Sequence, residues 1–133
     1  MAIIIDASVL CAYANIEDVH YSKARIILEK IMLKRREGLI ITDHLFDETV
    51  NVVMRKKGRD EAINFGRFIM DSEFLLASTS INVFRKAWDM FQQTENFSFT
   101  DCATIAFMGV NGINRIATFD KEFKKIKEIE VVD

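Results

Sequence analysis

Proline is absent from the 133 residues, and cysteine and glycine are scarce, with two and five occurrences. Cys11 and Cys102 show neither paired nor metal-binding spacing, which excludes a disulfide framework and favours a reducing, cytoplasmic location. Internal repeats, low-complexity tracts and linker-like stretches are also missing. We therefore expect residues 1–133 to form a single domain, which their number suits.

Long hydrophobic runs are missing too. The longest uncharged stretches, residues 74–84 and 102–114, fall short of the ~20 apolar residues that a membrane-spanning helix needs. The N-terminus has no basic segment, and Asp6 interrupts its apolar run at once, so we expect neither a signal peptide nor membrane association.

An excess of positive charge is also lacking: 18 basic and 20 acidic residues give a net charge of −2. This excludes a protein held on nucleic acid by bulk positive charge. An enzyme that acts on nucleic acid remains open, because bound divalent metals can offset clustered carboxylates. Half of the residues are hydrophobic and 29% are charged, which is the composition of a globular domain with a real core.

Apolar runs rich in β-branched residues alternate with helical patterns along the chain. Strands are predicted at residues 2–5, 39–42, 74–78, 116–119 and 129–132, and helices at 19–36, 44–57, 81–94 and 101–110, with shorter ones from Ser8, after Asp60 and at Phe123. This order predicts an α/β fold, a three-layer sandwich in which helices flank a mostly parallel central sheet of four to five strands.

Local signals place the ends of three of these helices. Gly38 is expected to stop the helix at 19–36, and Gly58 to end the helix at 44–57. Asp43 is a plausible N-cap for that second helix, and Asp60 for the one after it.

Four acidic residues stand out by their position. Asp6 directly follows the first strand and Asp120 the fourth, Glu48 lies in the first turns of the helix after the second strand, and Asp101 begins a later helix. Open parallel sheets bind ligands beyond the carboxyl ends of their strands, where the strand order reverses. All four carboxylates can therefore meet at one edge of the sheet.

Each of these acids also has an ordinary structural interpretation. Asp101 can favour its helix as a first-turn acid or form a capping box with Ser98, Asp120 can be a turn or cap residue, and Glu48 can be solvated. Taken together they are harder to explain, because four like charges at one edge repel one another unless a cation binds there.

Mg²⁺ or Mn²⁺ is the simplest such cation. Hard cations prefer oxygen ligands, whereas a cluster without His or Cys is wrong for zinc. Metals in such a site activate water and stabilise the leaving oxygen of a phosphodiester.

The four acids lie in stretches that resemble the motifs of PIN-domain proteins, of the small single-domain kind that includes VapC-type toxins of toxin–antitoxin pairs. The matching segments are 3–10 (IIIDASVL), 41–49 (ITDHLFDET), 97–102 (FSFTDC) and 117–123 (ATFDKEF), in the family's order and over nearly the whole chain.

The resemblance implies an endoribonuclease that cleaves single-stranded RNA with one or two Mg²⁺ or Mn²⁺ ions. It assigns metal and catalytic roles to Asp6, Glu48, Asp101 and Asp120, and supporting hydroxyls to Ser8 and Thr118. It also implies a homodimer and a cognate antitoxin. Asp43 and Asp47 lie close to Glu48, but Asp47 is its immediate neighbour on the helix and faces elsewhere.

Other features allow more than one interpretation. The basic residues Arg55, Lys56 and Lys57 can simply favour a helix C-terminus, or can contact RNA phosphates. His20 and His44 show no metal-ligand spacing and are expected at the surface or as caps. Eleven Phe and six Met exceed what a small core needs, so some are expected at an interface.

Two alternatives to a toxin remain open. One is a non-catalytic PIN scaffold that binds RNA or protein, although a binder has no need for four repelling carboxylates. The other is an RNA-processing nuclease without an antitoxin. A phosphatase of the haloacid-dehalogenase type is disfavoured, because its second Asp would stand where this chain has Ser8.

Overall fold

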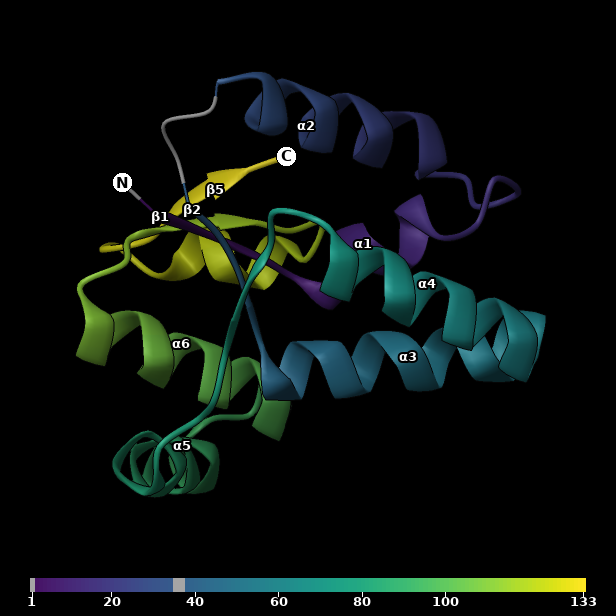
Figure 1. Cartoon of the computed structure of the whole chain (residues 1–133). Helices are drawn as coiled ribbons and strands as arrows, with labels where there is room; N and C mark the ends of the chain where they lie inside the picture. Colours follow the sequence, from purple (N-terminus) through teal and green to yellow (C-terminus); the bar gives the residue numbers. More distant parts are fainter. Residues whose placement is uncertain (1, 35–37) are drawn as a thin grey trace.

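The computed structural model describes residues 2–34 and 38–133 as a five-stranded parallel sheet with helices on both faces (Figure 1). The strands are β1 (Ala2–Ile5), β2 (Gly38–Thr42), β3 (Leu75–Ala77), β4 (Arg115–Ala117) and β5 (Glu130–Val132). The helices are α1 (Ala7–Tyr13), α2 (Tyr21–Leu33), α3 (Asp43–Lys57), α4 (Arg59–Asp71), α5 (Ile81–Gln93), α6 (Phe99–Asn111) and the 3₁₀ helix η1 (Lys121–Lys125).

The sheet has the order β3-β2-β1-β4-β5, so its strand order reverses between β1 and β4. Ile4 in β1 lies opposite Ile40 on one side and Ile116 on the other. Ile3, Ile4 and Ile5 are fully buried because helices cover both faces, as expected for a parallel sheet. The predicted three-layer α/β fold with a parallel sheet is confirmed.

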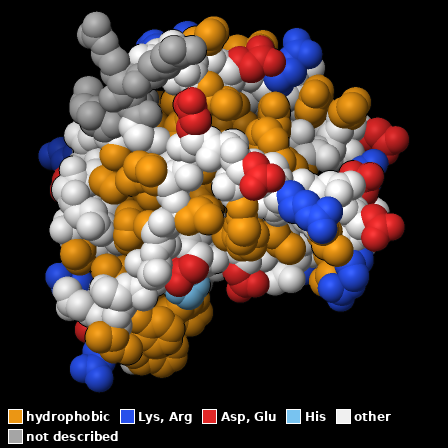
Figure 2. Space-filling model, in the orientation of Figure 1, with side chains coloured by type: hydrophobic (Ala, Val, Ile, Leu, Met, Phe, Trp, Pro, Cys, Tyr) orange, Lys and Arg blue, Asp and Glu red, His pale blue; other side chains and the backbone are white. Residues whose placement is uncertain are grey.

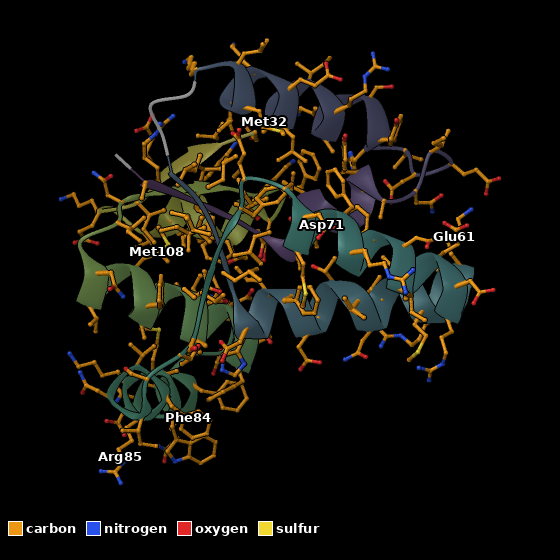
Figure 3. The ribbon with its side chains drawn as sticks, viewed as in Figure 1. Met32, Glu61, Asp71, Phe84, Arg85 and Met108 are labelled. Atoms are coloured by element: carbon orange, nitrogen blue, oxygen red, sulfur yellow. The ribbon has the colours of Figure 1, made fainter. Side chains whose placement is uncertain are left out.

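Helices form the two outer layers. Figure 1 shows α2 on one side of the sheet, and α3 and α6 on the other, with α5 packed outside α6. Met108 on α6 is buried against the sheet, while Phe84 and Arg85 lie on α5 at the outer edge of the molecule (Figure 3). No helix within the described ranges has the length and apolarity that crossing a membrane requires.

Both predicted N-caps are wrong by one or two residues. Thr42, not Asp43, caps α3: its Oγ1 accepts the Leu45 N–H at 3.2 Å, and Asp43 is already helical. Gly58 ends α3 as predicted, with a φ of 95°. The same glycine is the N-cap of α4, so Asp60 lies within the first turn of α4 instead of capping it.

Gly38 does not act as a helix stop. It is the first residue of β2, opposite Ala2, and a Cβ there would lie only 3.2 Å from Leu75 Cδ1. The preceding helix begins two residues later than predicted and ends at Leu33. Residues 35 and 36 of the predicted helix lie outside the described part of the chain.

Candidate active site at the carboxyl ends of the central strands

Asp6 lies where β1 ends and α1 begins, and it is almost completely buried, with 5% of its surface exposed. Burial raises the pKa of this carboxyl, while hydrogen bonds from two hydroxyls lower it without reversing the net rise. Ser8 Oγ and Thr118 Oγ1 each donate to Asp6 Oδ2 at 2.7 Å. A buried acid with a raised pKa is costly as a bare anion, which is typical of a functional site.

The same hydroxyls join β1 to the end of β4. Ser8 Oγ accepts the Phe119 N–H at 3.1 Å, and Thr118 Oγ1 accepts the Asp120 N–H at 3.0 Å. Asp6 N–H in turn donates to Ala117 O at 2.9 Å. This network spans the reversal in strand order, where open parallel sheets place their ligands, and it holds Asp120 next to Asp6.

Asp101 caps a helix and also interacts electrostatically with the other acids. Its N–H donates to Ser98 Oγ and its Oδ2 accepts the Ser98 N–H, both at 3.1 Å, so the predicted capping box is present. Burial is the main reason that the pKa of Asp101 is raised, and the charges of Asp6 and Asp120 raise it further. The helix cap therefore fixes a carboxylate that also faces other acids.

Glu48 stands on α3, whose N-terminus follows β2. Desolvation raises the pKa of this carboxyl, as do the charges of Asp6 and Asp101, whereas Arg55 on the same helix lowers it. Arg55 lies seven residues after Glu48, two turns along the same face of α3. The acids on β1, α3 and α6 thus act on one another although they are far apart in sequence.

All four predicted acids line one open cavity of about 440 Å³. Its walls are formed by Asp6, Ala7, Ser8, Cys11, Glu48, Val52, Ser98, Asp101 and Asp120. Among the described residues, however, no three His, Cys, Asp or Glu side chains lie close enough to hold a single ion. A metal here would therefore have few direct protein ligands, which suits Mg²⁺, since it commonly binds one or two carboxylates and keeps water or phosphate as its other ligands.

Two further acids near Glu48 lie outside the cavity lining. Asp43 Oδ1 accepts the Thr79 hydroxyl at 2.6 Å and the His44 N–H at 3.0 Å. Asp47 Oδ1 accepts from Asn51 Nδ2 at 2.8 Å on the outer face of α3. Of the three acids at the start of α3, only Glu48 borders the cavity.

The three basic residues near the C-terminus of α3 have different partners in the structure. Lys57 forms an ion pair with Glu17 at 3.4 Å. Arg55 lowers the pKa of Glu48, and Lys56 lowers the pKa of Cys11. Because Glu48 and Cys11 both line the cavity, these two positive charges act on the cavity.

Four cavity residues were not singled out as site residues by the sequence: Ala7, Cys11, Val52 and Ser98. Cys11 lines the cavity, where burial and the charge of Glu48 raise the pKa of its thiol to about 11. Val52 lies one turn after Glu48 on α3, so helical spacing could have indicated it. Ser98 was noted only as a cap, and its place in the cavity follows from the Asp101 capping box.

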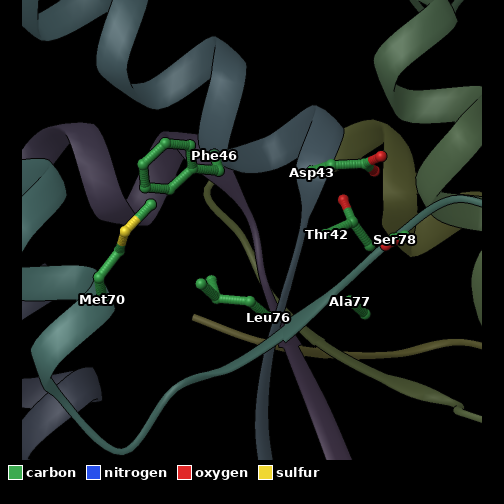
Figure 4. A pocket seen from close by; sticks show the side chains of 7 residues that line it. All are labelled: Thr42, Asp43, Phe46, Met70, Leu76, Ala77 and Ser78. Atoms are coloured by element: carbon green, nitrogen blue, oxygen red, sulfur yellow. The ribbon is translucent and has the colours of Figure 1, made fainter.

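A second hollow opens beside β2 and β3 (Figure 4). It has a volume of about 240 Å³ and is mostly apolar, with Phe46, Met70 and Leu76 around it and Asp43 at one end.

Hydrophobic side chains also gather over α5 in the lower left of Figure 2. There Trp88 keeps 51% of its surface exposed.

The chain is similar in sequence to a protein of described function. A VapC ribonuclease from Archaeoglobus fulgidus is 27% identical over 104 residues, 76% of this chain and 66% of that protein. The match thus spans just under two thirds of that relative's length.

Two solved structures have the same fold. VapC20 from Mycobacterium tuberculosis, described as a toxin that cleaves the sarcin–ricin loop, matches 92% of this chain and 93% of its own with a TM-score of 0.81 at 19% identity. VapBC2 from Rickettsia felis, solved bound to a DNA fragment from their promoter, matches with a TM-score of 0.72 at 14% identity over 100% of both chains.

The sequence itself matches the family model of the PIN domain from residue 3 to residue 129. That range contains β1 through η1, and with them all four acids of the cavity. The resemblance in the motifs is thereby confirmed, and the chain belongs to the PIN-domain family.

Proposed function

We propose that this protein is a Mg²⁺- or Mn²⁺-dependent endoribonuclease that cleaves single-stranded RNA as the toxin of a VapBC-type pair. The observation that carries the proposal is the cavity at the ends of β1 and β4, which Asp6, Glu48, Asp101 and Asp120 share. The charges of Asp6 and Asp101 raise the pKa of Glu48, and Asp6 also raises that of Asp101. Such mutual repulsion calls for a cation, and the hydrolysis of a phosphodiester uses one.

The donor set fits a hard divalent cation, because all four acids offer oxygen and the single thiol, Cys11, is protonated at neutral pH. In the proposal, Asp6 and Asp101 hold one or two ions directly, Glu48 holds an ion or orients the attacking water, and Asp120 completes the set. The bound ion supplies an activated water and stabilises charge on the leaving oxygen.

The chain's own residues prepare the site. Ser8 and Thr118 keep the Asp6 carboxylate in one orientation by donating to the same oxygen. The Ser98 N–H does the same for Asp101. Because Thr118 also accepts the Asp120 N–H, one buried hydroxyl fixes two of the acids relative to each other.

Substrate approach needs positive charge, since the cavity itself repels phosphate. Arg55 and Lys56, at the end of α3, are proposed to contact RNA phosphates on the Glu48 side of the cavity. Lys57 is less suited to this role because of its ion pair with Glu17.

The deciding experiment is cleavage of a long single-stranded RNA by purified protein in EDTA, Mg²⁺ or Mn²⁺, beside Asp6→Asn prepared in the same way. Metal-dependent cutting that the variant has lost supports the proposal. Equal cutting by the variant indicates a contaminating nuclease. Metal-induced stabilisation of the wild type without any cutting points to a narrow substrate, whereas neither cutting nor metal binding favours the non-catalytic scaffold.

A cognate antitoxin is proposed as the protein partner, supported by kinship with VapC proteins. Co-expression with a small protein encoded beside this one tests it. A stable complex that no longer cuts RNA is the expected result. An active nuclease that captures no such neighbour would instead be an RNA-processing enzyme.

A second copy of this chain is proposed as a further partner, and the exposed stripe on α5 is its contact surface. Ile81, Phe84, Trp88 and Phe91 repeat at the spacing of a seam between packed helices, and a twofold axis would pair the stripe with itself. Light scattering should give the mass of a dimer, and Trp88→Glu that of a folded monomer. A monomeric wild type at high concentration would contradict the assignment.

A further inference from the structure

Phe119 is joined to the acid cavity through its backbone. It lies between Thr118, which binds Asp6, and Asp120, which lines the cavity. Its own N–H donates to Ser8 Oγ at 3.1 Å. Any movement of the Phe119 backbone would therefore disturb the hydrogen bonds of Asp6, so this backbone has a fixed position next to the cavity residues.

The Phe119 ring stacks on an imidazole from a distant part of the chain. His20, just before α2, lies with its ring centroid 5.1 Å from that of Phe119 and at an interplanar angle of 30°. His20 is exposed, and its side chain makes no capping hydrogen bond to α2. Helix capping therefore does not explain the position of the imidazole, which stays exposed while it stacks on Phe119.

A cation completes this cluster. Lys23, one turn along α2, places its Nζ 6.0 Å from the centroid of the Phe119 ring. The nearby carboxylate of Asp133 is bound by Lys124 at 2.7 Å. Two stacked rings and an ammonium group thus lie together beside a site that is otherwise acidic.

We propose that His20 and Phe119 form a stacking subsite for an RNA base next to the cavity, with Lys23 contacting the phosphate of that nucleotide. The inference rests on the proposed ribonuclease function and adds the position of a substrate base to it. Unpaired bases present π-faces to aromatic side chains, and cations beside the stack hold the backbone. Double-stranded RNA keeps its bases paired and cannot use such a subsite.

A second aromatic cluster, around Phe99, is less suited to this role. Around Phe99, the rings of His44, Phe84 and Phe91 pack edge-on, at interplanar angles of 74°, 63° and 81°. None of these three rings lies parallel to that of Phe99. The stacked pair of this cluster, Phe91 on Trp88 at an interplanar angle of 27°, belongs to the exposed stripe of α5. His44 therefore provides a matched control for His20, since both imidazoles contact a Phe ring but only His20 stacks on it.

The experiment measures binding of a fluorescein-labelled single-stranded RNA to the cleavage-deficient Asp101→Asn protein by anisotropy in Mg²⁺. Loss of one base stack costs about 5- to 100-fold in affinity, so His20→Ala should weaken binding within that range and His20→Phe should restore it. His44→Ala should change binding less than twofold. Lys23→Gln should reduce the slope of log affinity against log salt by about 0.7.

The outcomes separate this inference from the function on which it rests. If Asp101→Asn and the wild type bind no RNA under any metal condition, the ribonuclease proposal fails. If they bind RNA but His20→Ala binds equally well, or His44→Ala loses as much, only the stacking subsite is overturned. Thermal unfolding of each variant checks the fold, and exposed His20 should tolerate replacement with little change in Tm.

Discussion

Two aspartates occupy equivalent places in this fold and differ in almost every other respect. Asp6 follows β1 and Asp43 follows β2, each at the start of a helix on the same edge of the sheet. Burial dominates at Asp6 and its pKa is raised. At Asp43 burial also raises the pKa, but hydrogen bonds from the Thr79 hydroxyl and backbone N–H outweigh it, and the pKa is lowered.

The difference shows what separates a structural acid from a candidate catalytic one. The Asp43 carboxylate is satisfied by protein donors, and it joins α3 to the segment after β3. Asp6 lies at the reversal of strand order, where three other carboxylates face it and add negative charge. A cation would neutralise the negative charge around Asp6, whereas the Asp43 carboxylate already has hydrogen-bond donors from the protein.

Replacing each aspartate by asparagine should give the largest contrast. Asp6→Asn should lower metal-dependent cleavage by roughly 10³-fold or more, the scale on which loss of a central catalytic group acts. Asp43→Asn should leave cleavage within about twofold, since its partners lie outside the cavity. Initial rates on one RNA substrate in Mg²⁺ measure both, and equal losses would remove the distinction between the two sites.

The threonine hydroxyls that donate to the two aspartates should also differ in their effect on cleavage. Thr118→Val removes a donor to Asp6 and the acceptor of the Asp120 N–H, and should reduce cleavage by about 10- to 100-fold. Thr79→Val removes the corresponding donor to Asp43, and should cost about 1 kcal/mol of stability with little effect on cleavage. Rates and urea unfolding of both variants check this, and a Thr118→Val enzyme with full activity would contradict it.

Basic residues on α3 test the proposed contact with RNA phosphates. Arg55→Ala should lower kcat/KM by about tenfold, the scale of one charged contact to phosphate. Lys57→Ala should have a smaller effect, under about twofold, since Lys57 pairs with Glu17 at the surface. A salt titration of kcat/KM distinguishes the two, and a larger loss for Lys57→Ala would place the RNA elsewhere.

The pH dependence of the free energy of unfolding distinguishes Asp6 from Asp43 without any substrate. In the metal-free protein the raised pKa of Asp6 contributes stability that is complete below its unfolded value of 3.8 and is lost as pH rises through the folded pKa. Asp6→Asn should therefore become relatively more stable than the wild type as pH rises, and Mg²⁺ should stabilise only the wild type.

Asp43 should behave in the opposite way. Its lowered pKa contributes stability that is present above 3.8 and is lost as pH falls through the folded pKa. Asp43→Asn should accordingly be less stable than the wild type at neutral pH and approach it in acid. Thermal unfolding in EDTA across this range measures both trends; a metal-free Asp6→Asn protein less stable than the wild type at neutral pH would show that Asp6 is a structural acid.

Much of the fold and the candidate site followed from local patterns. Continuous apolar runs such as Ile3–Ile4–Ile5 indicated buried parallel strands, and an acid after such a strand has to lie at the sheet's edge. The sequence also placed Glu48 and Asp101 at the starts of helices, which begin at that same edge. Predictions failed where two local signals competed, as when Thr42 rather than Asp43 capped α3.

The sequence by itself therefore determined the order of strands and helices and the edge at which the acids gather, because both depend on spacing along a few residues. Tertiary structure alone decided that Thr118 binds Asp6 across 112 positions, that Asp43 is satisfied by Thr79, and that His20 stacks on Phe119. Burial and the pKa of a carboxyl depend on every group packed around it, and those groups come from segments that meet only when the sheet has formed.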